Sequence, residues 1–391
     1  MEREGIFQPW GRVHHRFKGA GINMKRLVIH PGFHKSGTTA LQEALAESRQ
    51  ALKDKDVLYP YIGTKTHHRA AWSLNGQVWG WKKRGGEKYS PKIWDDLVKR
   101  INGAKEETVI LSSEFFSELD GEKIRKIRHD IKSRDIEILF TLRPLAKLLP
   151  SSYQQYLKYG MKIKYEEWLH EIFENREKTK VSPTFWRRHD HGKVIARWVD
   201  IFGTSNVTIL IADENKPDFL FEEVNNFLGL PKETLTAAEI GSNRSLNMEE
   251  ISLLLEINNQ FPKERSWDEY EIFIRDGYIR ELTDFIVPAK GKARLLTPEW
   301  AITRANELGE KTSQEFDRLG IRVIGSLDSL GAATVPIGQS VYPETIDIKT
   351  VASAMLAFDE RRVNKFPSSW ILRSLRRRIT NQLKLRLKGL S

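Results

Sequence analysis

The 391-residue chain contains no cysteine. Disulfide bridges, thiolate metal sites and a cysteine nucleophile are therefore excluded. The chain also lacks a run of about 18 apolar residues, which a membrane-spanning helix needs, and the stretch before Met24 has no apolar core of signal-peptide length. We expect a cytoplasmic location on these grounds. Hydrophobic residues at 40% and charged residues at 29% are typical of a globular protein with a sizeable core.

Acidic residues are missing from the C-terminal tail, where most of the net charge of +11 is concentrated. Residues 361–391 hold ten Lys or Arg and no Asp or Glu. Residues 1–24 carry a net +2, which leaves −1 for residues 25–360. The body is thus nearly neutral, so nucleic acid is an improbable partner for it. Tails of this kind bind acidic surfaces.

The tail also has a regular apolar pattern. After Pro367, apolar residues recur at every fourth position: Ile371, Leu375, Ile379, Leu383 and Leu387. At helical pitch this spacing predicts an apolar stripe bordered by cations, which is typical of a helix lying on an anionic membrane surface. We expect residues 361–391 to bind the inner membrane face in this way. A helix packed back on the domain and a basic arm touching nucleic acid without specificity are the alternatives.

Short aliphatic segments alternate with helix-like segments through the first half of the chain. The expected strands are Arg26–Pro31, Val57–Tyr61, Thr108–Ser112, Ile136–Leu142 and Val207–Ala212. The expected helices between and after them include Thr39–Leu52, Ile93–Asn102, Tyr165–Asn175 and Lys193–Phe202. Continuous apolar runs suit strands that are buried on both faces. The pattern predicts a three-layer α/β domain, a parallel sheet with helices on both faces.

Composition suggests the domain boundaries. Residues 1–23 form an N-terminal extension, and residues 24–330 form the α/β domain with a helical part from about Asn247. Residues 331–391 comprise a linker and the basic tail. Leu330–Glu344 is the best linker candidate because it is rich in Gly and Pro and has few charges.

The loop "GFHKSGTT", Gly32 to Thr39, lies between the first expected strand and the first expected helix. Such a loop offers backbone N–H groups and the positive end of a helix dipole to an anion. Its glycines permit tight turns, Lys35 adds a point charge, and Thr38 and Thr39 add hydroxyl groups. A plain strand-to-helix turn is the alternative. The Walker A order G-x-x-x-x-G-K-[ST] is absent, because Lys35 precedes the second glycine, Gly37.

The loop resembles the 5′-phosphosulfate-binding loop of the sulfotransferases, K-[ST]-G-T-[TS]. The resemblance extends over about residues 25–261, most closely to bacterial and glycan-modifying members that share "HKSGTTALQ", a following "HH", "ILSSE" and "NRSLN". It implies a P-loop-like fold and 3′-phosphoadenosine 5′-phosphosulfate (PAPS) as donor without a metal ion. It implies a catalytic role for Lys35 and donor contacts by His34, Lys35, Ser36, Gly37, Thr38 and Thr39.

A second match concerns the donor's 3′-phosphate. Members of the family carry an Arg at the end of a strand and a Ser eight residues later, and here Arg143 and Ser151 fit that spacing. The planar fork of an arginine suits a dianionic phosphate. A structural salt bridge is the alternative for Arg143. The glycine-rich "RKG" element of the animal enzymes is missing, and Arg244 in "GSNRSLN" is a candidate to replace it.

A hydroxyl acceptor also needs a general base. The resemblance places it at the end of the third strand, where the chain has Glu114, although a solvated strand end is an equal alternative. His68 is a rival, supported by a similar histidine in the glycan-modifying branch, and His67 is weaker. His34 is expected to pack or to contact the donor.

The acceptor is expected to be a glycan or another hydroxylated metabolite. The segment "AAWSLNGQVWGWKKRGG" holds Trp72, Trp79 and Trp81, which suit stacking on sugar faces, although a buried Trp72 is the alternative.

Two other functions stay open on the sequence. An ATP-dependent kinase of the same fold would use Glu114 to hold Mg²⁺, but it would leave Arg143 and Ser151 without a role. A non-enzymatic module would bind membrane or nucleic acid through the tail.

Overall fold

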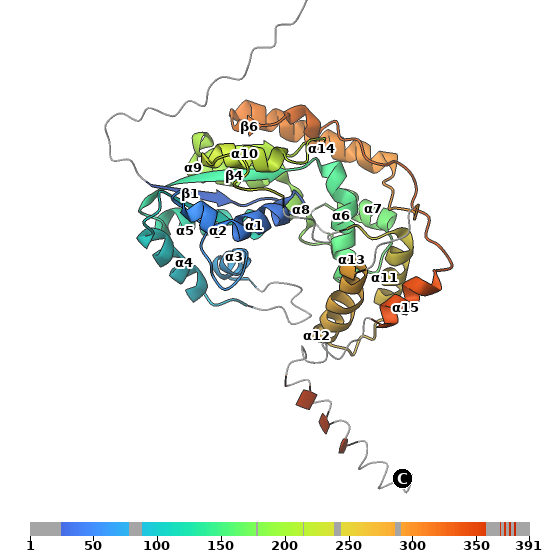
Figure 1. Cartoon of the computed structure of the whole chain (residues 1–391). Coiled ribbons are helices and arrows are strands. Elements are labelled where there is room, and N and C mark those ends of the chain that lie inside the picture. Colours follow the sequence, from blue (N-terminus) through green and yellow to red (C-terminus); the bar gives the residue numbers. More distant parts are fainter. Residues whose placement is uncertain are drawn as a thin grey trace, which may run out of the picture.

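The computed structural model (Figure 1) describes residues 25–77, 88–176, 179–213, 215–237, 244–285 and 291–356, and positions 368, 371–372, 375–376 and 379–380. The described residues contain a six-stranded sheet in the order β2-β3-β1-β4-β5-β6, and every neighbouring pair is parallel. The strands are β1 (Lys25–His30), β2 (Val57–Leu58), β3 (Thr108–Ser112), β4 (Arg134–Leu142), β5 (Val207–Ile211) and β6 (Arg322–Ile324). The predicted α/β class is confirmed.

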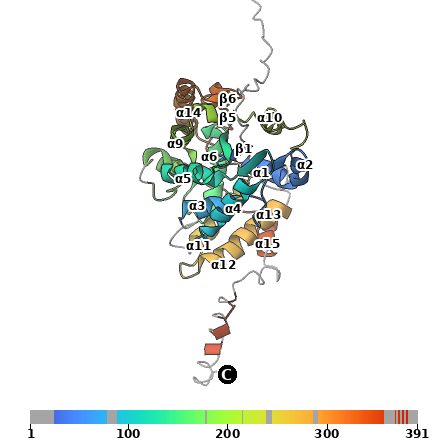
Figure 2. The same ribbon diagram turned by 90° about the vertical axis from the view of Figure 1, so that its left-hand side faces the viewer.

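Alternate residues of each strand face opposite sides of the sheet. Leu27 and Ile29 of β1 pack in one apolar core, and Val28 between them packs in another. Because both faces are covered, the strands consist of continuous apolar runs rather than alternating ones. Figure 2 shows the helices of the two faces on either side of the sheet.

One face is covered by α1 (Thr38–Glu47), α2 (Arg49–Lys53) and α10 (Phe219–Leu228). The other face is covered by α3 (His68–Asn75), α4 (Lys92–Gly103), α5 (Gly121–Asp130), α9 (His191–Phe202) and the C-terminal half of α14 (Glu299–Leu319). The short 3₁₀ segments η2 (Glu114–Glu118), η3 (Thr204–Asn206) and η5 (Leu327–Leu330) connect these elements.

A third apolar core is built mainly from helices. It is formed by α6 (Leu145–Lys158), α7 (Tyr165–Glu174), α8 (Phe185–His189), α11 (Met248–Gln260), α12 (Trp267–Tyr270), the π-helical η4 (Glu271–Ile279), α13 (Arg280–Phe285) and the N-terminal half of α14. Helix α14 contributes Ala301 to this core and Phe316 to the core beneath the sheet, so it connects the two. Helix α15 (Ile348–Leu356) packs against η4 and α13.

Several boundaries differ from the sequence-based expectations. The expected helix Thr39–Leu52 is interrupted at Ser48, which separates α1 from α2. The second strand is shorter than expected, since only Val57 and Leu58 pair with β3. Strand β6 was not expected at all. Its three residues are too few to produce a recognisable pattern, and pairing with β5 defines them.

The segment Leu330–Glu344, which we expected to be a linker, contacts the domain closely. The backbone N–H of Thr297 donates to Pro336 O, and the N–H of Tyr165 donates to the Tyr342 hydroxyl at 2.9 Å. A Cβ placed on Gly309 of α14 would lie 1.9 Å from Leu330 O, so glycine permits the close approach of the two backbones. Residues 330–342 therefore stabilise the helical part of the domain.

Candidate active site

The carboxyl ends of three adjacent strands bring the predicted residues together. The loop Gly32–Gly37 follows β1, Glu114 follows β3, and Arg143 follows β4, in the sheet order β3-β1-β4. In open α/β sheets, ligands bind at this edge. The sequence separations of Gly32 from Glu114 and Arg143 are large, and only the parallel pairing makes the three segments neighbours.

The loop after β1 has three residues in the left-handed region: Gly32 (φ +55°), Lys35 (φ +68°) and Gly37 (φ +86°). A Cβ on Gly32 would lie 2.9 Å from side-chain atoms of Thr38, so the first glycine is required for space as well as for conformation. Gly37 is the N-cap of α1 and has no side chain to cap the helix. The first N–H groups of α1 therefore point at the edge of the sheet where an anion would bind.

The hydroxyl groups of Ser36 and Thr38 hold the loop and do not face solvent. Both residues are buried, and both hydroxyls donate to Phe33 O, at 2.8 Å and 2.9 Å. Lys35, Gly37 and Thr39 are exposed. The hydroxyl hydrogens of Ser36 and Thr38 are thus used within the loop, and the donor contacts expected of these two residues stay a prediction.

A buried chain of hydrogen bonds supports the loop from below. The Ser36 hydroxyl donates to Phe33 O, so Thr141 must donate to Ser36 Oγ at 3.0 Å. Thr141 Oγ1 then accepts from His30 Nε2 at 3.0 Å, and His30 Nδ1 accepts from the Ser112 hydroxyl at 2.7 Å. Burial lowers the pKa of His30 to about 4, which keeps the ring neutral. The chain runs in one direction and connects β3, β1 and β4 to the loop.

Lys35 and Arg143 meet at the exposed side of the loop. Arg143 Nη1 donates to Lys35 O at 3.1 Å, and Lys35 Nζ donates to Gln155 Oε1 of α6 at 3.1 Å. The sequence predicted both residues as donor contacts, and the fold brings them to one place. Gln155 was not predicted because a lone glutamine in a helix carries no sequence signal.

The other two predicted donor contacts have partners within the protein. The Ser151 hydroxyl, on α6, donates to Leu148 O at 3.0 Å. Arg244 makes a bidentate ion pair with Glu250, at 2.8 Å and 2.7 Å, and also donates to Leu282 O at 2.6 Å. Arg244 thereby fixes the start of α11. Its expected contact with the 3′-phosphate stays a prediction, and that contact would have to share this guanidinium with Glu250.

The two candidate bases lie beside each other. His68 Nδ1 is 3.7 Å from Glu114 Oε2 and 2.8 Å from Ser113 Oγ, and Gln42 Nε2 donates to the same Glu114 oxygen at 3.0 Å. Burial raises the pKa of Glu114, but His68, His34 and Gln42 together lower it below its ordinary value. Burial lowers the pKa of His68, against the effect of Glu114. At neutral pH the pair is therefore a carboxylate beside a neutral imidazole.

His67 is structural and does not reach the site. It is fully buried, its Nε2 donates to Pro60 O at 2.9 Å, and its Nδ1 accepts from the Ser112 N–H at 3.1 Å. Both ring nitrogens are used by the backbone, so His67 cannot act as a base. The neighbouring His68 begins α3 and is partly exposed.

Comparison with known proteins finds structural similarity only at low sequence identity. No protein-family model matches the chain, and no curated protein matches its sequence. A solved structure of a sulfotransferase from Alicyclobacillus acidocaldarius aligns with 60% of this chain and 92% of that chain, at 16% sequence identity and a TM-score of 0.40. A likeness this weak assigns no activity to this chain.

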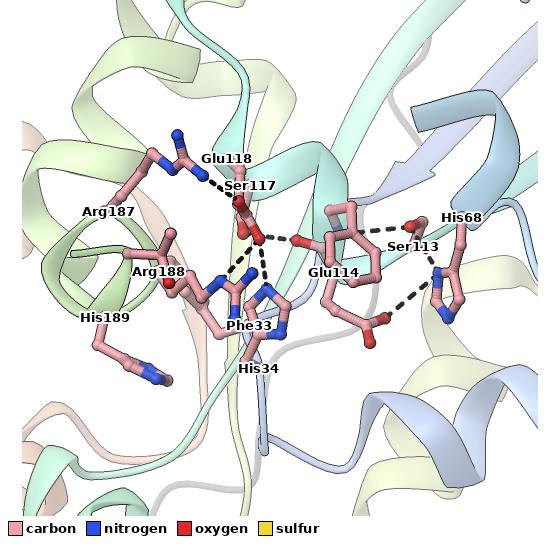
Figure 3. A network of polar contacts seen from close by, with 12 residues as sticks. Phe33, His34, His68, Ser113, Glu114, Ser117, Glu118, Arg187, Arg188 and His189 are labelled. Carbon is pink, nitrogen blue, oxygen red and sulfur yellow. Dashed lines mark hydrogen bonds and ion pairs between the residues drawn. The ribbon is translucent and has the colours of Figure 1, made fainter. Parts of the chain in front are cut away.

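One part of the site was missed by the sequence analysis. Glu118, at the end of η2, is almost completely buried and accepts from Arg187 Nη2 at 2.9 Å and from Arg188 Nε at 2.8 Å. His34 Nε2 also bonds to it at 3.0 Å (Figure 3). Burial raises the pKa of Glu118, but Arg188, His34 and Arg187 lower it far below its ordinary value. No sequence signal pairs residues that are about 70 positions apart.

Several sequence-based expectations concern residues outside the described part of the chain, and two others concern membrane helices and metal ligands. Trp79 and Trp81 lie outside the described residues, as does most of the tail 361–391. Within the part of the chain that is described, every helix is too short or too polar to cross a membrane. The same residues contain no group of three or more His, Asp or Glu side chains arranged to hold a metal ion.

Proposed function

We propose that this chain is a sulfotransferase that moves a sulfuryl group from PAPS to a hydroxyl group of an acceptor. The observation that carries the proposal is the hydrogen bond from Arg143 to Lys35 O. It joins the lysine loop after β1 to the arginine after β4, the two features that distinguish a donor with a 3′-phosphate from ATP. Neither feature alone is specific.

The residues at the edge of the sheet suit sulfuryl transfer. PAPS supplies the sulfuryl group, and the remaining roles fall to the chain. Lys35 and the N–H groups at the start of α1 stabilise the negative charge that develops on the phosphate as its bond to sulfur breaks. Glu114 accepts the proton of the acceptor hydroxyl as oxygen bonds to sulfur, and it is ionised for this task. Gln42 Nε2, which donates to Glu114 at 3.0 Å, orients that carboxylate, and His68 lies 3.7 Å from it.

The aromatic wall beside the bases favours a ring-shaped acceptor, for which we propose a glycan. Trp72 is partly exposed, its ring centre is 5.2 Å from that of Tyr89 with the planes stacked, and it is 4.6 Å from that of Phe115. The His68 ring centre is 5.8 Å from that of Trp72. Aromatic faces next to a general base suit the apolar faces of a sugar.

Calorimetry with two nucleotides tests the donor. The product 3′-phosphoadenosine 5′-phosphate (PAP) should bind wild type at least about tenfold more tightly than ADP, because Arg143 contributes only with the 3′-phosphate. Arg143→Lys, which keeps the charge but not the fork, should lose most of that preference and retain ADP binding. A wild-type preference for ADP would instead indicate a kinase.

We also infer that the tail attaches the enzyme to an anionic membrane surface. The apolar side chains that are described there, Ile371, Leu372, Leu375 and Ile379, are between 40% and 66% exposed. Residues 361–391 add ten basic side chains and no acidic one. Anionic lipid contributes on the order of 1 kcal/mol per basic residue near the surface.

Sedimentation with liposomes tests the tail. The full chain should pellet with anionic but not with neutral liposomes, and high salt should release it. The truncated control should lack residues 361–391 only, since a cut after Leu330 would also remove Tyr342 and its contact with α7. Equal sedimentation of the two chains would remove the tail from membrane binding.

A further inference from the structure

Two adjacent arginines of α8 share one carboxylate. Glu118 Oε2 accepts from Arg187 Nη2, and Glu118 Oε1 accepts from Arg188 Nε. His34 is the remaining partner, and burial and Arg188 lower the pKa of its ring, so it stays neutral at neutral pH. The cluster Glu118–Arg187–Arg188 therefore carries one positive charge that no carboxylate in the described residues balances.

The two arginines are held differently. Arg188 is anchored through Nε, and among the described residues this bond to Glu118 is its side-chain hydrogen bond. Its side chain is 22% exposed, and the bond from Nε to Glu118 fixes the guanidinium in place. Arg187 is 39% exposed, and among the described residues its second terminal nitrogen makes one long contact, of 3.4 Å, with Gln77. A guanidinium fixed through Nε with a free terminal fork is suited to a bidentate oxyanion.

The Arg188 guanidinium and the candidate base His68 lie around the same aromatic ring, that of Phe115. The guanidinium carbon of Arg188 is 6.0 Å from the ring centre of Phe115, and the His68 ring centre is 5.1 Å from the same point. Phe115 follows Glu114 directly in η2, so one short segment separates the arginines from the base. Figure 3 shows the Glu114 carboxylate on the side of His68 and the Glu118 carboxylate on the side of the arginines.

We propose that Arg188, assisted by Arg187, binds an anionic group of the acceptor, and that the acceptor is an acidic sugar. The proposal rests on the proposed function, which it deepens by naming the acceptor class. A carboxylate, sulfate or phosphate on one side of the sugar occupies the Arg188 fork, while a hydroxyl on the other side reaches Glu114. The uncompensated charge of the cluster attracts such a group, and the aromatic wall holds the ring between the two.

The phosphates of the donor are oxyanions too, and they are the alternative ligand for the Arg188 fork. These phosphates are assigned to Lys35, the start of α1 and Arg143, at the β1 and β4 ends, whereas Arg188 is reached from η2 and α8. If the fork binds the donor, the Arg188 variants should lose affinity for PAP; if it binds the acceptor, they should keep it. PAP affinity is therefore measured in every variant below.

The test compares glucuronate with glucose, which differ in one carboxylate, in the presence of saturating PAP. Titration followed by ligand-observed NMR should give wild type a dissociation constant for glucuronate at least about tenfold lower than for glucose. Arg188→Gln should bind the two sugars equally. Arg188→Lys should keep part of the preference, because it retains charge without the fork. PAP affinity should stay within about twofold of wild type in both variants.

Arg176→Gln is the matched control. Arg176 is 37% exposed and pairs with Asp190 at 2.7 Å, so it resembles Arg187 in exposure and pairing but lies outside the cluster. It should leave the sugar preference unchanged. Should Arg188→Gln fail to fold, Arg187→Gln keeps the Arg188–Glu118 bond, and it should reduce the preference at least about threefold.

Equal binding of the two sugars to wild type would overturn the acidic-acceptor inference and leave the donor proposal standing. The same holds if the preference for glucuronate survives in both Arg188→Gln and Arg187→Gln. A tenfold loss of PAP affinity in Arg188→Gln would assign the fork to the donor and would also overturn it. Failure of wild type to bind PAP would instead overturn the proposed function, which is a separate result.

Discussion

Replacement of Lys35 separates chemistry from stability more cleanly than any other change at this site. Lys35→Ala removes the cation next to the leaving phosphate, so turnover with saturating donor should fall by about 10² to 10³, or about 2.7–4 kcal/mol of transition-state stabilisation. The native conformation should survive. The side chain is exposed, and among the described residues it makes one hydrogen bond, to Gln155, which contributes about 1 kcal/mol.

The backbone of Lys35 provides an internal check on that reasoning. Its φ of +68° is unfavourable for lysine and alanine alike, so Lys35→Ala neither adds nor relieves strain. Lys35→Gly relieves it and should be at least as stable as Lys35→Ala, by up to about 1 kcal/mol, with the same loss of turnover. Two variants that are equally slow but differ in stability would show that the charge, rather than the fold, was lost.

The assay is a single-turnover measurement at saturating donor, with thermal unfolding of each variant. Lys35→Ala should melt within about 4 °C of wild type. Gln155→Ala removes the partner of Lys35 without removing charge, and it should keep turnover within about threefold of wild type. If Lys35→Ala turned over at the wild-type rate, the loop would not be the place where the chemistry occurs, and the sulfotransferase mechanism would be wrong.

Three further predictions follow from the contacts around the loop. Glu114→Gln should lower turnover at neutral pH with little change in donor affinity, and His68→Ala should have a smaller effect; a dead His68→Ala beside an active Glu114→Gln would reverse the assignment. Thr141→Val breaks the buried chain of hydrogen bonds, so the free energy of unfolding measured by chemical denaturation should fall by about 2 kcal/mol and PAP binding should weaken. Thr141→Ser, which keeps the hydroxyl, and the control Thr208→Val at a buried threonine of β5 should bind PAP normally. The folded-state pKa of Glu118 lies far below its ordinary value of 4.5, so its ionised form stabilises the protein above that pH and this stability is lost as the pH falls toward the folded-state pKa. Acid titration of unfolding should therefore show a steeper loss below pH 4.5 for wild type than for Glu118→Gln, and parallel curves would contradict the role of that carboxylate.

The amino-acid sequence alone determined the fold class and the element that begins the site. Aliphatic runs such as Thr108–Ser112 are local signals, because strands buried on both faces need continuous apolar residues. The loop from Gly32 to Thr39 is equally local, since its glycines and lysine are adjacent in the chain. Helix boundaries and β6 were less predictable, because pairing and packing with distant residues decide where short elements end.

Only the tertiary structure decided which side chains act together. Ser36 and Thr38 look like donor ligands in the sequence, but the fold turns their hydroxyls toward Phe33 O. Adjacent histidines receive opposite roles, because the backbone occupies both nitrogens of His67 and leaves His68 beside Glu114. These differences depend on distances between segments far apart in the chain. A parallel sheet sets such distances through its strand order, which no local pattern of residues specifies.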